Sequence, residues 1–170
     1  MKKIVRAYLA NQFGFSETGR YLLNNLFKPR LDKIGIKVLD PFVECANELN
    51  FSYIETLRLF KDRKKYWEEF SKKVASINNR LMQGADCLLA ILDGGHAIDD
   101  GVASEIGYYA GIKRGPIFAL RSDFRCGENI GTLINPQILG YIIQSKGKLC
   151  EPPDAIENWF KAVKAFRQAI

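Results

Sequence analysis

The stretch that decides the fold is CLLAIL at residues 87–92, followed by DDGVASEIGYY at residues 99–109. A continuous apolar run of this length is typical of a strand buried on both faces, as in a parallel sheet. The second segment reads as a turn with acids and a glycine, and then as a helix that carries Glu105 near its start. Ligands bind beside the carboxyl ends of parallel strands, so we expect this stretch to border a small-molecule site.

The rest of the chain alternates between short apolar runs and stretches of helical spacing. We expect strands at residues 4–10, 36–39, 86–92 and 117–120, with a last short strand at 140–143. We expect helices from Ser16 as N-cap to near Gly35, over 53–84 as two helices, over 101–113, and after Pro152 or Pro153. Residues 41–52 and 121–137 are expected to be loops. This order predicts a single-domain α/β protein over residues 1–170, with a parallel, Rossmann or flavodoxin-like sheet flanked by helices.

The composition excludes several classes of protein. The 170 residues suffice for one domain, and the 47% apolar and 26% charged fractions are those of a soluble globular chain. No apolar run approaches the ~20 residues of a membrane span, and the N-terminus reads as a strand rather than a signal peptide. We therefore predict a cytoplasmic protein with no membrane partner.

The formal net charge of +6 favours an anionic partner. The densest charges, at residues 61–73, alternate in sign at helical spacing, which is typical of a solvated helix face. No nucleic-acid motif is present, so we predict no nucleic-acid partner.

Cysteine and histidine usage argues against a metal site. The chain has one histidine, His96, and no Cys-x-x-Cys pair, and its four cysteines are expected to be free thiols: Cys45, Cys87, Cys126 and Cys150. The turn after the first strand, ANQFGF at 10–15, lacks the glycine pattern of a dinucleotide or triphosphate cradle. We predict no cofactor and no metal.

Two groups of side chains are candidates for binding and chemistry. Phe13 and Phe15 either stack on a planar ring or cover the edge of the sheet. Glu105 lies in the first two turns of its helix, where the helix dipole favours a carboxylate anion, as a nucleophile on an anomeric carbon requires. Either Asp99 or Asp100 caps this helix and leaves the other to face a ligand; we expect Asp100 to be the cap.

Five segments together resemble the nucleoside 2'-deoxyribosyltransferase family, over roughly residues 4 to 143. They are IVRAYLA at 4–10, ADCLLA at 85–90, the pattern DxGxxxExGY at 99–108, DFR at 123–125 and INPQ at 134–137. The resemblance implies transfer of a 2'-deoxyribosyl group between nucleobases in nucleoside salvage. Glu105 would form a covalent glycosyl ester, which a second nucleobase would then displace.

The resemblance also implies roles for single residues. Tyr8 would hold the nucleophile by a hydrogen bond, although a strand tyrosine is also a plain core residue. Asp99 would contact the base and help protonate its leaving nitrogen. Asn135 would reach into a neighbouring subunit and bind the sugar 5'-hydroxyl, which implies a homo-oligomer; an Asn before proline is also an ordinary turn residue. Gly101 and Gln137 belong to the matching motifs and are predicted to line the substrate site.

One position departs from the family pattern. Asn78 stands where many members carry an aspartate. An amide can bind a base edge through a donor and an acceptor, but it cannot act as a general acid. Protonation of the leaving group would then fall on Asp99 or on water.

Two other functions remain open. The first is hydrolysis of the N-glycosidic bond of a nucleoside or nucleoside 5'-monophosphate by the same glutamate, for which Ser16 and Ser104 are the hydroxyls available to a phosphate. The second is a non-catalytic nucleotide-binding module on the same fold, because fold does not establish activity. Residues 41–65 are a possible lid.

Overall fold

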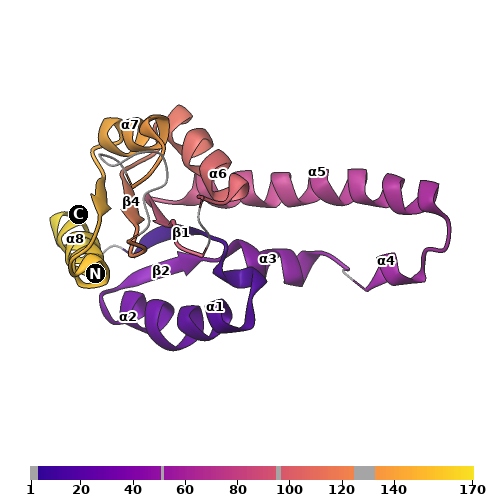
Figure 1. The fold of residues 1–170 in the computed structure, drawn as a ribbon, viewed down its shortest axis with the longest axis horizontal. Coiled ribbons are helices and arrows are strands. Elements are labelled where there is room, and N and C mark those ends of the chain that lie inside the picture. Colours follow the sequence, from indigo (N-terminus) through magenta and orange to yellow (C-terminus); the bar gives the residue numbers. More distant parts are fainter. Residues whose placement is uncertain (1–3, 51, 95–96, 125–132) are drawn as a thin grey trace.

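A five-stranded parallel sheet forms the centre of the protein in a computed structural model that describes residues 4–50, 52–94, 97–124 and 133–170 (Figure 1). The strand order is β2-β1-β3-β4-β5, and every neighbouring pair is parallel. The strands are β1 (Val5–Asn11), β2 (Ile36–Leu39), β3 (Cys87–Ile91), β4 (Ile117–Leu120) and β5 (Lys148–Cys150). The predicted α/β class with a flavodoxin-like parallel sheet is therefore confirmed.

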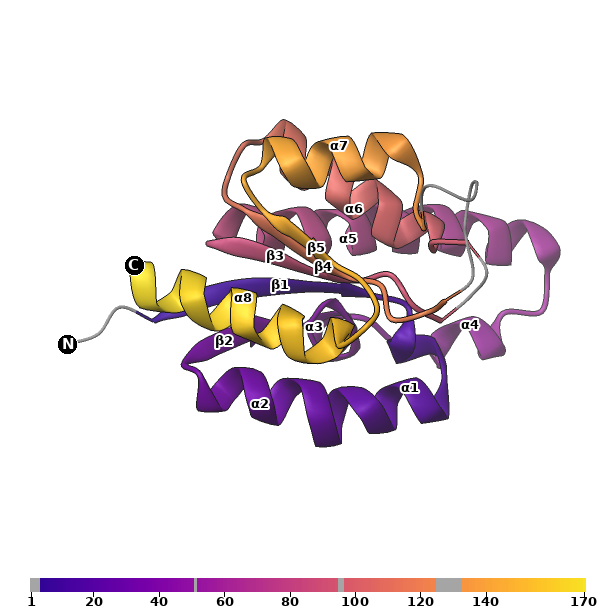
Figure 2. The same cartoon turned by 60° about the vertical axis from the view of Figure 1, so that its left-hand side comes forward.

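Helices cover both faces of this sheet (Figure 2). One face carries the N-terminal helical segment and the C-terminal helix: η1 (Phe13–Phe15), α1 (Glu17–Leu22), η2 (Leu23–Phe27), α2 (Lys28–Lys33) and α8 (Ala155–Ala169). The other face carries α3 (Pro41–Glu48), α5 (Phe60–Gly84), α6 (Asp100–Gly111) and α7 (Pro136–Gln144). The short helix α4 (Tyr53–Thr56) lies below the outer end of α5, which projects beyond the sheet (Figure 1).

Strand β1 shows how the two cores are separated. Successive side chains of a strand point to opposite faces. Val5, Ala7 and Leu9 belong to the core under α1, α2 and α8. Tyr8 and Ala10 belong to the core under α5, α6 and α7. The alternation therefore directs the Tyr8 hydroxyl to the α5–α6 side.

The helix predicted from Ser16 to Gly35 is present, but it contains a wide turn. The Ser16 hydroxyl accepts a hydrogen bond from the Gly19 N–H at 2.9 Å, as the predicted N-cap should. In the π-helical segment η2, the Lys28 N–H donates to the Leu23 carbonyl, five residues earlier. Pro29 follows directly and has no N–H to donate, so the widened turn lies where the regular ladder is interrupted.

Two predicted elements are wrong. Residues 41–48 form helix α3 rather than a loop, because the Asp40 carboxylate accepts from the Phe42 N–H at 2.9 Å and Pro41 fits the first helical turn. Residues 140–143 belong to helix α7, and the last strand is β5. A short apolar run does not distinguish strand from helix, and the buried Ile138 and Ile142 in fact stand four residues apart.

The remaining boundaries shift by a few residues. Helix α8 begins at Ala155 after Asp154, not at Pro152 or Pro153. The predicted 121–137 loop lies partly outside the described residues, and α7 begins at Pro136. The 53–84 stretch forms two helices, as predicted. No helix in the described part of the chain is both long and apolar enough to cross a membrane.

Candidate active site

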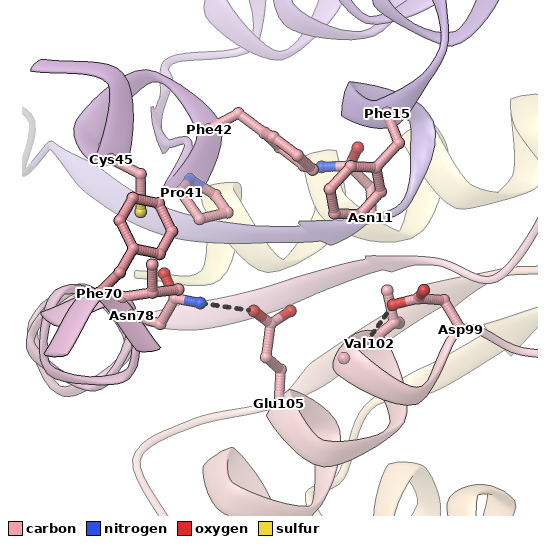
Figure 3. Close-up of a pocket in the computed structure, with 12 residues that line it drawn as sticks. Asn11, Phe15, Pro41, Phe42, Cys45, Phe70, Asn78, Asp99, Val102 and Glu105 are labelled. Carbon is pink, nitrogen blue, oxygen red and sulfur yellow. Dashed lines mark hydrogen bonds between the residues drawn. The ribbon is translucent and has the colours of Figure 1, made fainter. Parts of the chain in front are cut away.

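The candidate site lies at the switch point of the sheet, where the chain order reverses between β1 and β3. Such a reversal opens a crevice at the carboxyl ends of the strands. A cavity of about 370 Å³ occupies this place, between α3, α5 and the start of α6 (Figure 3). Its polar side chains come from strand β1, helix α5 and the start of α6: Asn11, Asn78, Asp99 and Glu105. The cavity is otherwise mostly apolar.

The Glu105 carboxylate is held by two donors from different elements. The Tyr8 hydroxyl, on β1, donates to Glu105 Oε1 at 2.5 Å. The Asn78 side-chain amide, on α5, donates to the same oxygen at 3.2 Å (Figure 3). Among the described residues, Glu105 Oε2 accepts no hydrogen bond. The predicted pairing of Tyr8 with Glu105 is therefore present, whereas the amide of Asn78 is used on the carboxylate.

Burial controls the protonation of this pair. It raises the pKa of Glu105 to about 7, while the hydrogen bond from Tyr8 lowers this pKa and the negative charge of Asp99 raises it. Glu105 is the sixth residue of α6, and the helix dipole acts mainly within the first turn. The predicted stabilisation of the anion by the helix is therefore outweighed by burial. Burial and the neighbouring Glu105 also raise the pKa of Tyr8, which keeps its hydroxyl protonated as a donor.

Helix α6 is capped by Asp99, and not by Asp100 as predicted. Asp99 Oδ1 accepts from the Val102 N–H at 3.0 Å, whereas Asp100 is exposed in the first turn. A Cβ on Gly101 would lie 2.9 Å from the same Oδ1 atom, so glycine leaves room for the cap. Asp99 nevertheless lines the cavity with Glu105, so one carboxylate both caps the helix and faces the site.

Comparisons with known proteins agree with this geometry. A family model described as nucleoside 2-deoxyribosyltransferase matches residues 7–149. The chain belongs to this family. The nucleoside 2-deoxyribosyltransferases are transferases that act on nucleosides and nucleobases, and the protein is an enzyme of this class.

Solved structures show the same fold at low sequence identity. A 2-deoxyribosyltransferase from Bacillus psychrosaccharolyticus superposes with a TM-score of 0.57 at 20% identity, covering 91% of this chain and 90% of its own. A 2-desoxiribosyltransferase from Leishmania mexicana gives a TM-score of 0.56 at 15% identity, covering 92% and 97% respectively. A search of curated protein sequences finds no match.

The two phenylalanines of the first turn have different surroundings in this deoxyribosyltransferase. Phe13 packs edge-on against Phe27, with ring centroids 6.2 Å apart, in the core on the far face of the sheet. It does not line the cavity, so its predicted contact with substrate is not supported. Phe15 is 76% exposed, lines the cavity and meets the ring of Phe42 at 4.8 Å.

Sequence reasoning missed several lining residues. Phe42 and Cys45 lie on helix α3, where the sequence predicts a loop and therefore no fixed side chains facing a site. Phe70 and Val74 line the cavity together with Asn78. These three stand at positions i, i+4 and i+8 on one face of α5, a spacing that the sequence does contain. Asn11, at the end of β1, carried no recognisable signal.

Asn135 and Gln137 lie away from Glu105 within one chain. Asn135 caps α7, since its side-chain oxygen accepts from the Gln137 N–H at 2.9 Å. Both residues line a separate cavity beside Arg121 and Tyr141. Neither residue lines the cavity that contains Glu105 within one chain.

The described residues hold no cluster of three His, Cys, Asp or Glu side chains suited to a metal ion. Cys45, Cys87 and Cys150 are buried free thiols, whereas Cys126 and His96 lie outside the described residues.

Proposed function

We propose that this enzyme moves a 2'-deoxyribosyl group between nucleobases through a covalent ester on Glu105, in nucleoside salvage. The observation that carries the proposal is the pattern of hydrogen bonds to the Glu105 carboxylate at the switch point. Tyr8 and Asn78 both bind Oε1, and Oε2 accepts no hydrogen bond in the described part of the chain. A carboxylate held in one orientation with one oxygen unoccupied is suited to nucleophilic attack.

The reaction takes two displacements at the anomeric carbon. Glu105 Oε2 attacks this carbon while its bond to the base nitrogen breaks, and the departing base keeps the electron pair and takes a proton. A nitrogen of the second base then attacks from the opposite side, the ester C–O bond breaks, and the Glu105 carboxylate is restored. Two inversions retain the original configuration, as in retaining glycosidases.

Asp99 is the group that exchanges a proton with the base. It is the other carboxylate that lines the cavity, and it lies at the start of the helix that carries Glu105. The Asn78 amide cannot supply a proton. We therefore assign both proton transfers to Asp99: its protonated form donates to the leaving base nitrogen, and the carboxylate that results accepts the proton released by the incoming base.

The walls of the cavity suit a planar base. Phe15, Phe42 and Phe70 reach it from η1, α3 and α5 (Figure 3). Stacking on an aromatic ring contributes about 1–3 kcal/mol per base and tolerates different bases, because every base has a π-face. Gly101 lines the same cavity and keeps it open beside Asp99.

The site is completed by a second copy of the chain. We propose that Asn135, with Gln137 beside it, enters the neighbour's cavity and binds the sugar 5'-hydroxyl. This proposal accounts for the absence of both residues from the Glu105 cavity within one chain, where they line another cavity. The assembly would be a homo-oligomer built on dimers, each chain a single domain over residues 1–170, acting in the cytoplasm.

Hydrolysis of nucleoside 5'-monophosphates receives less support. The two hydroxyls considered for a phosphate are already engaged with backbone groups. Ser16 Oγ accepts from the Gly19 N–H at 2.9 Å, and Ser104 Oγ donates to the Gly101 carbonyl at 2.8 Å. Binding a phosphate would require these contacts to be rearranged.

One experiment separates the three functions. The protein is incubated with deoxyinosine and adenine, and the products are followed by chromatography, with Glu105→Gln as the control. Formation of deoxyadenosine by the wild type alone supports transfer. Release of hypoxanthine without a new nucleoside indicates hydrolysis, and binding without turnover indicates a non-catalytic module.

A further inference from the structure

Asn78 makes a contact that its predicted role does not explain. Its Nδ2 donates to Glu105 Oε1 at 3.2 Å, and its Oδ1 is buried with no hydrogen-bond partner among the described residues. A buried acceptor without a partner is unfavourable by about 1–3 kcal/mol. The bond to Glu105 is therefore the one polar interaction that the described structure gives this side chain.

Helix α5 holds Asn78 firmly in this place. Its neighbours Ile77, Leu81 and Met82 are buried in the core against the sheet. A rigid element fixes the donor more narrowly than a loop would, so the Nδ2 group stays directed at Glu105. The side chain is thereby committed to the carboxylate rather than free to follow a base.

The charges around Glu105 make neutral donors important. The negative charge of Asp99, at the start of α6, raises the pKa of Glu105. The charge of Glu105 in turn raises the pKa of the Cys45 thiol on α3. Tyr8 on β1 is also close to Asp40, whose partner is Lys28 at 2.5 Å. None of the described groups that act on Glu105 is a cation. Within the described part of the chain, the side chains that donate hydrogen bonds to this carboxylate are the neutral groups of Tyr8 and Asn78.

We propose that Asn78 is a positioning residue for the transfer reaction. Together with Tyr8 it holds Oε1, so that Oε2 is the attacking oxygen, and its neutral amide allows Glu105 to ionise where an aspartate would oppose it. The amide at position 78 thus acts on the nucleophile rather than on the edge of the base. The catalytic part of this inference rests on the proposed function. The hydrogen bond between Asn78 and Glu105 is independent of that function.

The test compares Asn78→Ala and Asn78→Asp with the wild type and with Lys73→Ala, an exposed change on the same helix. Loss of the donor in Asn78→Ala should lower kcat about tenfold at neutral pH and move the acid limb of kcat up by about one pH unit. The added carboxylate in Asn78→Asp should move the acid limb of kcat to still higher pH. KM for the nucleobase should change by less than about twofold in Asn78→Ala, since a lost transition-state contact acts on kcat.

The opposite pattern would overturn the inference. An unchanged acid limb in both variants, with a raised KM for the nucleobase, would show that Asn78 reads the base. Lys73→Ala should match the wild type, and thermal melting should establish that each variant is folded.

A second measurement does not depend on activity. The Glu105 carboxyl carbon is titrated by NMR in protein labelled with ¹³C-glutamate, and Glu105→Gln assigns the resonance. Its pKa should rise from wild type to Asn78→Ala to Asn78→Asp, and an unchanged pKa would refute the inference. Absence of transfer by the wild type would refute the proposed function, while this titration would still decide the role of Asn78.

Discussion

The hydroxyl of Tyr8 lies 2.5 Å from Glu105 Oε1, although 97 residues separate the two in the chain. The contact forms because β1 and β3 are neighbours in the sheet and α6 follows β3. Tyr8 points to the α6 side, and Glu105 lies above the carboxyl end of the sheet. This bond links the sheet to the proposed nucleophile and lowers its pKa, against the larger opposing effect of burial.

Removing this bond should change the pH dependence of the enzyme. Tyr8→Phe keeps the buried ring but removes the donor that lowers the pKa of Glu105. The acid limb of kcat/KM, expected near pH 7 in the wild type, should move up by about one unit, with about a tenfold loss of rate at pH 6.5. A pH–rate profile of both proteins measures this. Superimposable profiles would show that Tyr8 does not act on Glu105.

The buried carboxyl should also lower stability above neutral pH. Burial raises the pKa of Glu105 from 4.5 to about 7, so between these values the folded protein binds more protons than the unfolded chain. The free energy of unfolding therefore falls as pH rises through this window, by on the order of 2–3 kcal/mol. Glu105→Gln should abolish this fall as well as turnover.

Urea unfolding at pH 5 and pH 8 measures the effect. The stability advantage of Glu105→Gln over the wild type should be larger at pH 8. Glu68→Gln, an exposed change on α5, is the control and should show no such difference. An equal difference in the free energy of unfolding between Glu105→Gln and the wild type at both pH values would show that Glu105 is in contact with solvent.

The two proposed roles of Asp99 can be separated by two substitutions. Asp99→Ala removes the cap of α6 and should lower the free energy of unfolding by about 1 kcal/mol, whereas Asp99→Asn retains an oxygen for the Val102 N–H. Both remove the proton donor and should lower kcat about 100-fold. Full activity in Asp99→Asn would show that Asp99 does not transfer the proton and that water does so instead. Asp100→Ala serves as control for stability and should change it by less than about 0.5 kcal/mol.

Phe13 and Phe15 should respond in opposite ways. Phe13→Ala removes a ring packed on Phe27 and should lower the free energy of unfolding by about 2 kcal/mol, with little change in KM. Phe15→Ala removes an exposed ring at the cavity and should raise KM for the nucleobase about tenfold, with little change in stability. Denaturant unfolding and steady-state kinetics on both variants test the contrast. A stability loss confined to Phe15→Ala would reverse the assignment.

The shared site can be tested by complementation. Glu105→Gln and Asn135→Ala chains are each expected to be nearly inactive alone. Co-expressed in equal amounts, they should recover about a quarter of the wild-type activity, since half of the dimers are mixed and each mixed dimer has one intact site. Glu105→Gln co-expressed with Asp99→Asn should recover almost none, because both groups come from the same chain. No recovery in the first mixture would place Asn135 outside the site.

Local sequence signals predicted most of the sheet. The apolar run at 87–92 is buried as β3, and Ser16 caps its helix, because burial and capping depend on residues that are near one another in the chain. The two errors that matter have the same origin. The loop expected from residue 41 is helix α3, which begins directly after the Asp40 cap, and the strand expected at 140–143 is part of helix α7.

The sequence by itself determined the class of fold, the family pattern and the identity of the acids beside β3, because these reside in composition, spacing and short motifs. Only the tertiary structure decided which acid caps α6, which phenylalanine reaches the cavity, and that Asn78 donates to the carboxylate. Those outcomes depend on the direction of individual side chains and on contacts between distant elements. The packing of α3, α5 and α6 around the switch point determines these side-chain directions and contacts. The same packing buries Glu105 and thereby raises its pKa.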